Sequence, residues 1–418
     1  MSIFKEILNR LKKIKFILIF IIAILFWIGP FIHNARAVPE FIINLERTMG
    51  NKQNDRGFFA QPTNDGGYII VGETQSCRRY GNGGYDAYLA KLNAKGYVQW
   101  HNTLGSDNND RGYSVRETSD GGYVIAGATQ PVFSQGYNNV YLAKTDASGK
   151  KEWHREFGGP GEDTGACVLQ TTDGGFIIAG ATTSSGAGDS DAYLIKTSAK
   201  GIKEWEKTFG GKETDFATTV RQTSDGGYIA AGQTYSYGAG GYDVYLVKTD
   251  ALGNQDWTQT FGGVGWDTAA SVEQTDDGGY IVIGQTASLG AGNNDIYLIK
   301  TNHTGEKIWE KTFGGADLDI GKTVQCAGDG GFLLAGWSNS FGKGELGLYL
   351  VKTDAQGNKL WEKIWTNGKL DPEFSITLNQ EKGFIVTGWW AERLSRQQDH
   401  NDEVDAYVVG VGYECGYE

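Results

Sequence analysis

The sequence predicts an all-β protein: a seven-bladed β-propeller whose blades are four-stranded antiparallel sheets. A unit of 52 to 55 residues occurs seven times, each copy reads as four short strands, and the two chain ends supply complementary parts of one unit. Self-similarity at a fixed period of this size is typical of propellers and solenoids. No segment after the amino terminus shows convincing helical periodicity.

An aromatic residue directly after a glycine-rich turn marks every copy of the repeat. The seven markers are Tyr68, Tyr123, Phe176, Tyr228, Tyr280, Phe332 and Phe384. A Tyr-Leu-x-Lys segment and a tryptophan follow in the same order in most copies, as at Tyr245 and Trp257. Alternating β-branched and aromatic runs bounded by glycine clusters are the signal of strands.

Each copy contains signals for four strands and the turns between them. In the fifth copy the first three strands are expected at 270–275, 280–286 and 296–301, and the fourth is expected to contain Trp309 and to end at Phe313-Gly314-Gly315. Asp277-Gly278 is expected to form a two-residue hairpin, because Asp-Gly supplies the positive φ angles that such a turn needs. Gly305 is expected to be the left-handed residue of the turn between strands 3 and 4.

The two chain ends indicate how the ring closes. Trp205 lies twenty residues before Asp225, and twenty residues before Asp65 is Leu45, so the chain begins with an isolated fourth strand at about 42–49. It ends near Val411, after strands 1 to 3 of a seventh unit. Pairing of these two parts would complete the last blade and leave no free sheet edge.

Residues 1–37 are expected to be a signal peptide, and residues 38–418 to form the propeller. A basic start is followed by an apolar run from Phe16 to Ile32 and by Ala35-Arg36-Ala37, the small-x-small pattern that precedes cleavage. An uncleaved membrane anchor is the alternative, although 17 residues are short for a span of about 20. Either way the propeller is expected to be secreted or at the cell surface.

The charge of the chain limits the classes of partner. The net charge is −12 for the whole chain; removal of six Lys/Arg and one Glu with residues 1–37 leaves 32 basic and 49 acidic residues, or −17. This argues against a nucleic-acid partner. A monomer with a protein or glycan ligand is expected, with membrane contact only through residues 1–37 if they are retained.

An aspartate recurs in every blade, just before the expected first strand. The seven residues are Asp55, Asp110, Asp163, Asp215, Asp267, Asp319 and Asp371. If the first strand is innermost, these carboxylates ring one mouth of the central channel. We expect them to accept backbone N–H bonds in the Phe-Gly-Gly loop. A calcium site is the alternative, although calcium needs six to eight oxygens that converge locally; no cofactor is predicted.

The loop between strands 2 and 3 is longest in blade seven, which makes it the candidate binding site. It runs 19 residues from Gly388 to Tyr407, against 13 to 16 in the other blades. The candidate residues of this loop, of the neighbouring blade-one loop and of blade five are Trp389, Trp390, Arg393, Arg396, His400, Arg78, Arg79, Tyr80 and Trp266. Aromatic residues beside arginines are favoured at interfaces, but the long loop could also merely cover the closure seam.

The repeat resembles that of uncharacterised exported β-propeller proteins of bacteria and archaea. The resemblance rests on DGGY, on YLVKTD and on the tryptophan of each copy, and covers residues 42 to 411. The segment YLVKTDALGNQDW is more distantly similar to the tryptophan-docking repeat of quinoprotein-like propellers. The resemblance implies a fold and little chemistry, because quinoproteins of this kind generally have eight blades and many have an adjacent cysteine pair.

Three functional hypotheses follow. The first is an exported, non-catalytic scaffold that binds a protein or glycan, since zinc-protease and nucleophile-elbow motifs are absent and no catalytic residue can be assigned. The second is a cation-dependent or quinoprotein-like enzyme that uses the acidic channel mouth. The third is a purely structural surface module.

Overall fold

The computed structural model describes residues 40–49, 55–75, 84–105, 108–131, 137–341, 345–366, 375–379, 383–391 and 404–414. The chain divides into two compact units, residues 43–412 and residues 1–42 with 413–418. The fold described below is that of the first unit. Every regular element within the described ranges is a β-strand. Among these residues there is no helix with the length and apolar character needed to cross a membrane.

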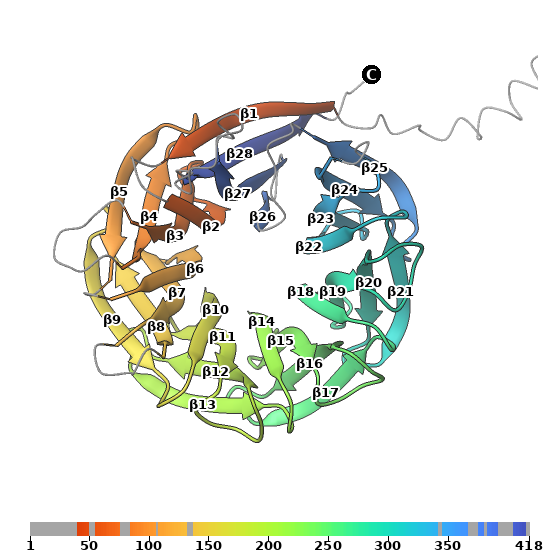
Figure 1. Cartoon of the computed structure of the whole chain (residues 1–418), viewed down its shortest axis with the longest axis horizontal. Helices are drawn as coiled ribbons and strands as arrows, with labels where there is room; N and C mark the ends of the chain where they lie inside the picture. The colour runs from red at the N-terminus through yellow and green to blue at the C-terminus, as the bar shows by residue number, and fades with distance from the viewer. Residues whose placement is uncertain are drawn as a thin grey trace, which may run out of the picture. The chain divides into compact units, whose positions relative to one another are not determined.

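Seven four-stranded sheets are arranged around a central axis as the blades of a propeller (Figure 1). In blades 1 to 6, four consecutive strands pair in chain order, so each blade is an antiparallel meander. The first strand of each blade lies nearest the axis and the fourth lies at the rim (Figure 1). The predicted fold class is therefore confirmed.

The first three blades have strands of equal length at each position. Blade 1 contains β2 (Asp55–Pro62), β3 (Tyr68–Thr74), β4 (Asp86–Leu92) and β5 (Val98–Leu104). Blade 2 contains β6 (Asp110–Glu117), β7 (Tyr123–Thr129), β8 (Asn139–Thr145) and β9 (Lys151–Phe157). Blade 3 contains β10 (Asp163–Gln170), β11 (Phe176–Thr182), β12 (Asp191–Thr197) and β13 (Lys203–Phe209).

The next three blades repeat this arrangement. Blade 4 contains β14 (Asp215–Gln222), β15 (Tyr228–Thr234), β16 (Asp243–Thr249) and β17 (Gln255–Phe261). Blade 5 contains β18 (Asp267–Gln274), β19 (Tyr280–Thr286), β20 (Asp295–Thr301) and β21 (Lys307–Phe313). Blade 6 contains β22 (Asp319–Cys326), β23 (Phe332–Ser338), β24 (Gly347–Thr353) and β25 (Lys359–Trp365).

Blade 7 is assembled from both ends of the chain. It contains β26 (Ser375–Asn379), β27 (Gly383–Ala391), β28 (Val404–Glu414) and the first strand, β1 (Glu40–Met49). The strand order in this sheet is β26, β27, β28, β1, so the early strand takes the outer position that a fourth strand holds elsewhere (Figure 1). This is the closure that the chain ends predict.

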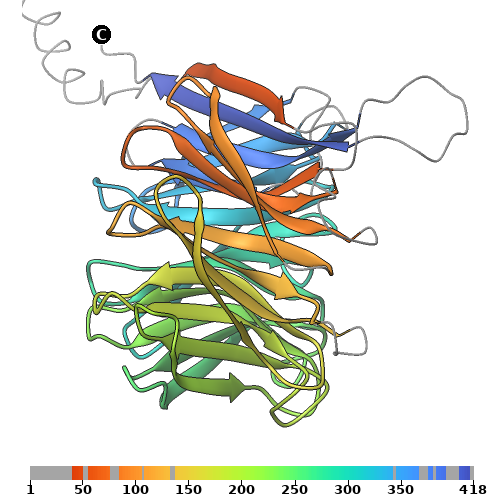
Figure 2. The same ribbon diagram turned by 90° about the vertical axis from the view of Figure 1, so that its left-hand side faces the viewer.

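The strands cross the ring from one face to the other, so successive connections lie on alternate faces (Figure 2). We call one face the aspartate face; it carries the starts of the first and third strands, such as Asp215 and Asp243. The opposite face is the turn face; it carries the hairpins around Gly226 and Gly253.

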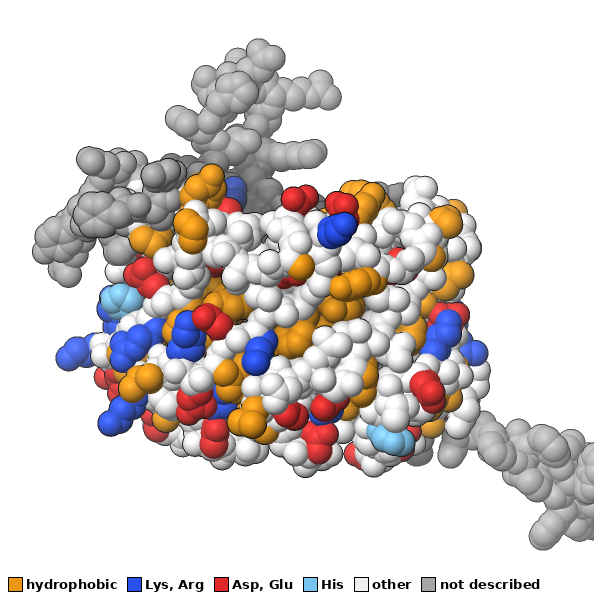
Figure 3. Space-filling view, turned by 90° about the horizontal axis from the view of Figure 1, so that it is seen from below, with side chains coloured by type: hydrophobic (Ala, Val, Ile, Leu, Met, Phe, Trp, Pro, Cys, Tyr) orange, Lys and Arg blue, Asp and Glu red, His pale blue; other side chains and the backbone are white. Residues whose placement is uncertain are grey.

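The core lies between adjacent blades, where the inner faces of neighbouring sheets meet. The Trp205 ring in β13 packs 5.7 Å from the Tyr228 ring of the next blade, and the same contact joins Trp257 to Tyr280. The tryptophan of one blade therefore docks on the marker aromatic of the next. On the side of the ring that Figure 3 shows, positive and negative side chains are interspersed.

Two local predictions differ from the structure. The loop of the Asp277-Gly278 hairpin has three residues rather than the predicted two. Thr275 N–H donates a hydrogen bond to Gly279 O, and Gly278 N–H donates one to Thr275 O. Only the glycine of the pair is needed at positive φ in a three-residue loop with a glycine bulge. The first strand of blade 5 begins at Asp267 rather than at Ala270, because pairing continues past a bulge between Ala269 and Ser271.

Candidate functional site

The predicted blade-seven loop is shorter than the sequence suggests. Trp389 and Trp390 belong to β27, where they pair with Ala406 and Asp405 of β28. The prediction that they are loop residues is wrong, because the second strand continues two residues past its glycine, as it does at Gln285 and Thr286 in blade 5. The remaining candidates of that site, Arg393, Arg396, His400, Arg78, Arg79 and Tyr80, lie outside the described residues.

The recurrent aspartates are buried acceptors at the start of the first strands. Asp215 accepts hydrogen bonds from Gly211 N at 2.8 Å and from Ser236 Oγ at 2.7 Å, and it is fully buried. Equivalent bonds from the Phe-Gly-Gly loop and the serine reach Asp163, Asp267 and Asp319. These carboxylates therefore hold two loops of the aspartate face together, as the structural interpretation predicts.

A second set of aspartates opens the third strands and faces the first set. An added Cβ on Gly262 would lie 2.2 Å from Asp243 Oδ1 and 2.5 Å from Asp267 Oδ2, so the two carboxylates flank this glycine. Burial, and then the charge of Asp267, raises the pKa of Asp243. Burial and the charge of Asp110 likewise raise the pKa of Asp86, to about 6.

The metal interpretation of the aspartate ring stays a prediction. Within the described ranges no group of three or more His, Cys, Asp or Glu side chains is arranged to hold a metal ion, and Asp371 lies outside them. Thermal unfolding with calcium and then with EDTA tests it, because an ion bound to the native state raises the midpoint.

Trp266 belongs to an exposed aromatic cluster on the aspartate face. Its indole ring contacts Tyr242 edge-on at 5.6 Å, and Tyr242 contacts Tyr235 edge-on at 5.1 Å. Trp266 is 62% exposed, and Val264 in the same loop is 84% exposed. We call Tyr235, Tyr242, Val264 and Trp266 the Trp266 cluster. It joins the loop between β15 and β16 of blade 4 to the loop that leads from β17 into blade 5.

Sequence reasoning identified Trp266 but not the rest of this cluster. Tyr235 and Tyr242 stand where blade 5 has Ala287 and Asn294, so their departure from the repeat was visible. Their contact with Trp266 was not, since the positions are 24 to 31 residues apart in the chain.

Comparisons with known proteins identify the fold. The chain is similar to the WD40 domain of Pan2 from Neurospora crassa, with 11% identity, a TM-score of 0.53, and coverage of 90% of this chain and 96% of that one. It is also similar to Sqt1 from Chaetomium thermophilum, with 9% identity, a TM-score of 0.51, and coverage of 90% and 100%. At these identities the likeness shows the propeller fold alone.

One curated protein shows sequence similarity to part of the chain. The regulatory protein FlaEY of Caulobacter vibrioides is 25% identical over 217 residues, which cover 45% of this chain and 22% of that protein. The match therefore spans about a fifth of the length of this relative. No family model matches the chain.

Proposed function

We propose that the protein is an exported, non-catalytic scaffold that binds a protein ligand on its aspartate face, at the Trp266 cluster. The observation that carries the proposal is the exposure of this cluster, since Trp266 and Val264 leave most of their surface in water. Exposed tryptophan and tyrosine side chains on loops of a rigid frame are typical of binding hot spots.

The loops that carry the cluster are anchored to the ring. Asp215 binds Ser236 between the two tyrosines of the blade-four loop, and Tyr237 donates a hydrogen bond to Gly210 O at 2.7 Å. Asp267, next to Trp266, accepts a bond from Gly263 N at 2.9 Å. Because the aromatic rings are held before binding, association loses less conformational entropy.

The side chains of the cluster favour a protein ligand over a glycan. Val264 adds an exposed aliphatic surface two residues from Trp266, and it offers no hydrogen bond to a sugar. Apolar side chains of a partner could cover Val264 and the indole together, as in the cores of protein interfaces.

Selection from a displayed peptide library, in parallel with a glycan array, tests the proposal. We expect selected peptides to bind the wild-type propeller. The Trp266→Ala substitution should lower their affinity at least tenfold, or by about 1.4 kcal/mol. The matched control is Leu252→Ala, because Leu252 is 67% exposed but lies on the turn face. Binding of glycans alone would contradict a protein ligand, and wild-type affinity of Trp266→Ala would contradict the site.

Export has its own test. The proposal rests on the apolar run and on Ala35-Arg36-Ala37, which end directly before Val38. We expect the protein recovered outside the cytoplasmic membrane to begin at Val38 when its amino terminus is sequenced. An uncleaved start at Met1 in that fraction would support the anchor instead, and recovery only from the cytoplasm would contradict export.

A further inference from the structure

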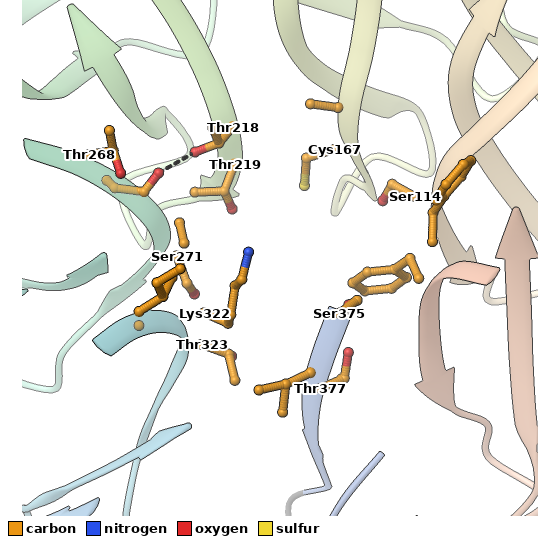
Figure 4. Close-up of a pocket in the computed structure, with 18 of the residues that line it drawn as sticks. Ser114, Cys167, Thr218, Thr219, Thr268, Ser271, Lys322, Thr323, Ser375 and Thr377 are labelled. Carbon is orange, nitrogen blue, oxygen red and sulfur yellow. Dashed lines mark hydrogen bonds between the residues drawn. The ribbon is translucent and has the colours of Figure 1, made fainter. Parts of the chain in front are cut away.

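A cavity of about 560 Å³ occupies the centre of the ring. Its wall is formed mainly by the first strands of the blades, and side chains from opposite sides converge on it (Figure 4). This volume lies within the range of small-molecule sites, roughly 300–1,000 Å³. The Trp266 cluster does not contribute to the lining, so this is a second candidate site.

Among the described residues that line the cavity, every charged side chain is positive, although the whole chain carries a net charge of −12. The three are Arg116 in β6, Arg221 in β14 and Lys322 in β22. The Lys322 side chain extends into the cavity (Figure 4). A concave site lined by one sign of charge concentrates the field on a ligand of the opposite sign.

Arg116 and Arg221 hold the same position in their strands but differ in their partners. Arg221 forms an ion pair with Glu273 at 2.9 Å. Arg116 instead donates from Nη1 to Gln61 Oε1 at 2.9 Å and to Val115 O at 3.0 Å, both neutral acceptors. Within the described ranges Arg116 has no ion pair with a carboxylate, because Leu169 holds, in the blade that follows Arg116, the position that Glu273 holds in the blade that follows Arg221.

Arg116 is therefore a partly desolvated cation that an anion would stabilise. Its guanidinium lies 4.7 Å from the centre of the Phe59 ring, which shields one face from water. Burial lowers the pKa of Arg116 to about 10, so the group stays charged at neutral pH. A partly buried charge without a counterion is unfavourable, and a bound anion would reduce that cost.

The rest of the wall offers hydroxyl groups. Thr268, Ser271, Thr323 and Ser375 line the cavity, and their hydroxyls form no hydrogen bond with the part of the chain that the structure describes. Other lining hydroxyls are used within the ring; Thr218 Oγ1, for instance, donates to Ala269 O at 2.8 Å (Figure 4). The first four are free to pair with hydroxyls of a ligand.

We propose that the central cavity binds a small hydroxylated organic anion, of the class of sugar phosphates and sugar acids. The anionic group binds Arg116, and Lys322 lines the same cavity. Ligand hydroxyls pair with Thr268, Ser271, Thr323 and Ser375. This site is independent of protein binding at the Trp266 cluster.

Calorimetric titration of the full propeller tests the ligand class. The probes are glucose 6-phosphate, gluconate, inorganic phosphate and glucose. We expect one or both of the hydroxylated anions to bind, and inorganic phosphate and glucose to bind at least tenfold more weakly, since each lacks one half of the recognised chemistry. Phosphate binding as strongly as its sugar ester, or no binding of either hydroxylated anion up to about 10 mM, would overturn the proposal.

Arg116→Gln tests the anion contact. The substitution should lower the affinity for the hydroxylated anion at least tenfold, because a charge-assisted hydrogen bond is lost. The matched control Lys150→Gln also removes one positive charge, but from an exposed turn, and should bind as the wild type does. Equal affinity of Arg116→Gln and wild type would overturn the role of Arg116.

Cys167 provides a second readout in the unaltered protein. Its thiol lines the cavity close to Arg221, whereas the exposed Cys326 lies near Glu273 and Asp276. We expect a sulfonate-bearing methanethiosulfonate to modify Cys167 faster than its trimethylammonium analogue, and the reverse preference at Cys326. Peptide mapping measures both ratios. The same preference at both cysteines would overturn a positive cavity, and the bound sugar phosphate should slow modification at Cys167 only.

Discussion

At the scale of single residues, the lysine of the Tyr-Leu-x-Lys motif and the aspartate of the Asp-Gly turn are one structural unit. Lys248 is buried, and its Nζ lies 2.8 Å from Asp225 Oδ2 and donates to Thr249 O at 2.9 Å. The same ion pair recurs in six blades: Lys91–Asp65, Lys144–Asp120, Lys196–Asp173, Lys248–Asp225, Lys300–Asp277 and Lys352–Asp329. It ties the third strand to the hairpin of its own blade.

Replacing this lysine should weaken one blade. Lys248→Met keeps the buried stem but removes the bonds to Asp225 and Thr249. Because the Asp225 side chain is 61% exposed and water can solvate it, we expect a loss of only about 1–2 kcal/mol. Urea unfolding measures it, with Lys150→Met on an exposed turn as the control. A loss no larger than that of the control would contradict the structural role of the pair.

At the scale of the strand pair, each of blades 1 to 6 needs a glycine opposite the bulge of its first strand. The register of β14 and β15 shifts between Ala217 and Thr219, and Gly232 faces Ala217. A Cβ on Gly232 would lie 1.9 Å from Phe216 O, a backbone atom that cannot swing away. The glycines at the same place in blades 1, 2, 3, 5 and 6 meet the same carbonyl at 1.7 to 2.0 Å.

Gly232→Ala should therefore be strongly destabilising. We expect a loss of more than about 3 kcal/mol, because the two backbones must separate to admit the methyl group. Gly328→Ala is the matched control: a Cβ there meets nothing within 4 Å, and its φ lies outside the left-handed region. Chemical denaturation measures the stability of both variants. Similar denaturation midpoints for Gly232→Ala and Gly328→Ala would show that the bulge can relax.

At the scale of the whole ring, stability depends on the strand that joins the chain ends. β1 pairs with β28 and completes blade 7. Without it, β28 would present an open edge, which is a template for pairing with another chain.

Removal of residues 38–49 should lower the thermal midpoint and promote association. Light scattering and calorimetry measure the two effects, and a synthetic peptide of residues 38–49 added in excess should reverse them by mass action. An unchanged midpoint and a monomeric shortened protein would show that closure contributes little.

The carboxylates make stability depend on pH in opposite directions. Burial and Asp110 raise the pKa of Asp86 from 3.8 to about 6, so its stabilising contribution is present below 3.8 and is lost as pH rises through 6. The turn aspartates behave oppositely. Burial alone would raise the pKa of Asp225, but bonds from Lys248, Thr223 and Gly227 N–H hold it at about 2.

We therefore expect maximal stability between about pH 4 and 6. From pH 7 downward the free energy of unfolding rises as Asp86 becomes protonated, and below about 4 it falls as Asp225 and its equivalents lose their ion pairs. The equivalents with a pKa of about 2 are Asp65, Asp120, Asp173 and Asp277. Urea unfolding across this range is the measurement, and a continuous decrease from pH 7 to 4 would contradict the assignment to Asp86.

The sequence by itself determined the blade count, the order of the four strands and the closure by residues 42–49. The strand order repeats every 52 to 55 residues, so local patterns specify it. The blade count follows from the number of copies, and the closure follows from the incomplete copies at the two chain ends. The predicted bounds of the second strand of blade 5, Tyr280–Thr286, agree with those of β19 in the structure. The limits of the first strand and the width of the hairpin could not be predicted, because bulges and turn closure depend on the partner strand.

The candidate sites were decided by the tertiary structure. Arg116 meets Gln61 across 55 residues of chain, and Arg221 meets Glu273 across 52, so the difference in their charge balance exists only after neighbouring blades pack. The same packing buries the recurrent aspartates and leaves Trp266 exposed beside Tyr242. A repeat pattern specifies what each blade is, whereas a site forms where side chains of different blades converge on one surface or one cavity, and that convergence requires the closed ring.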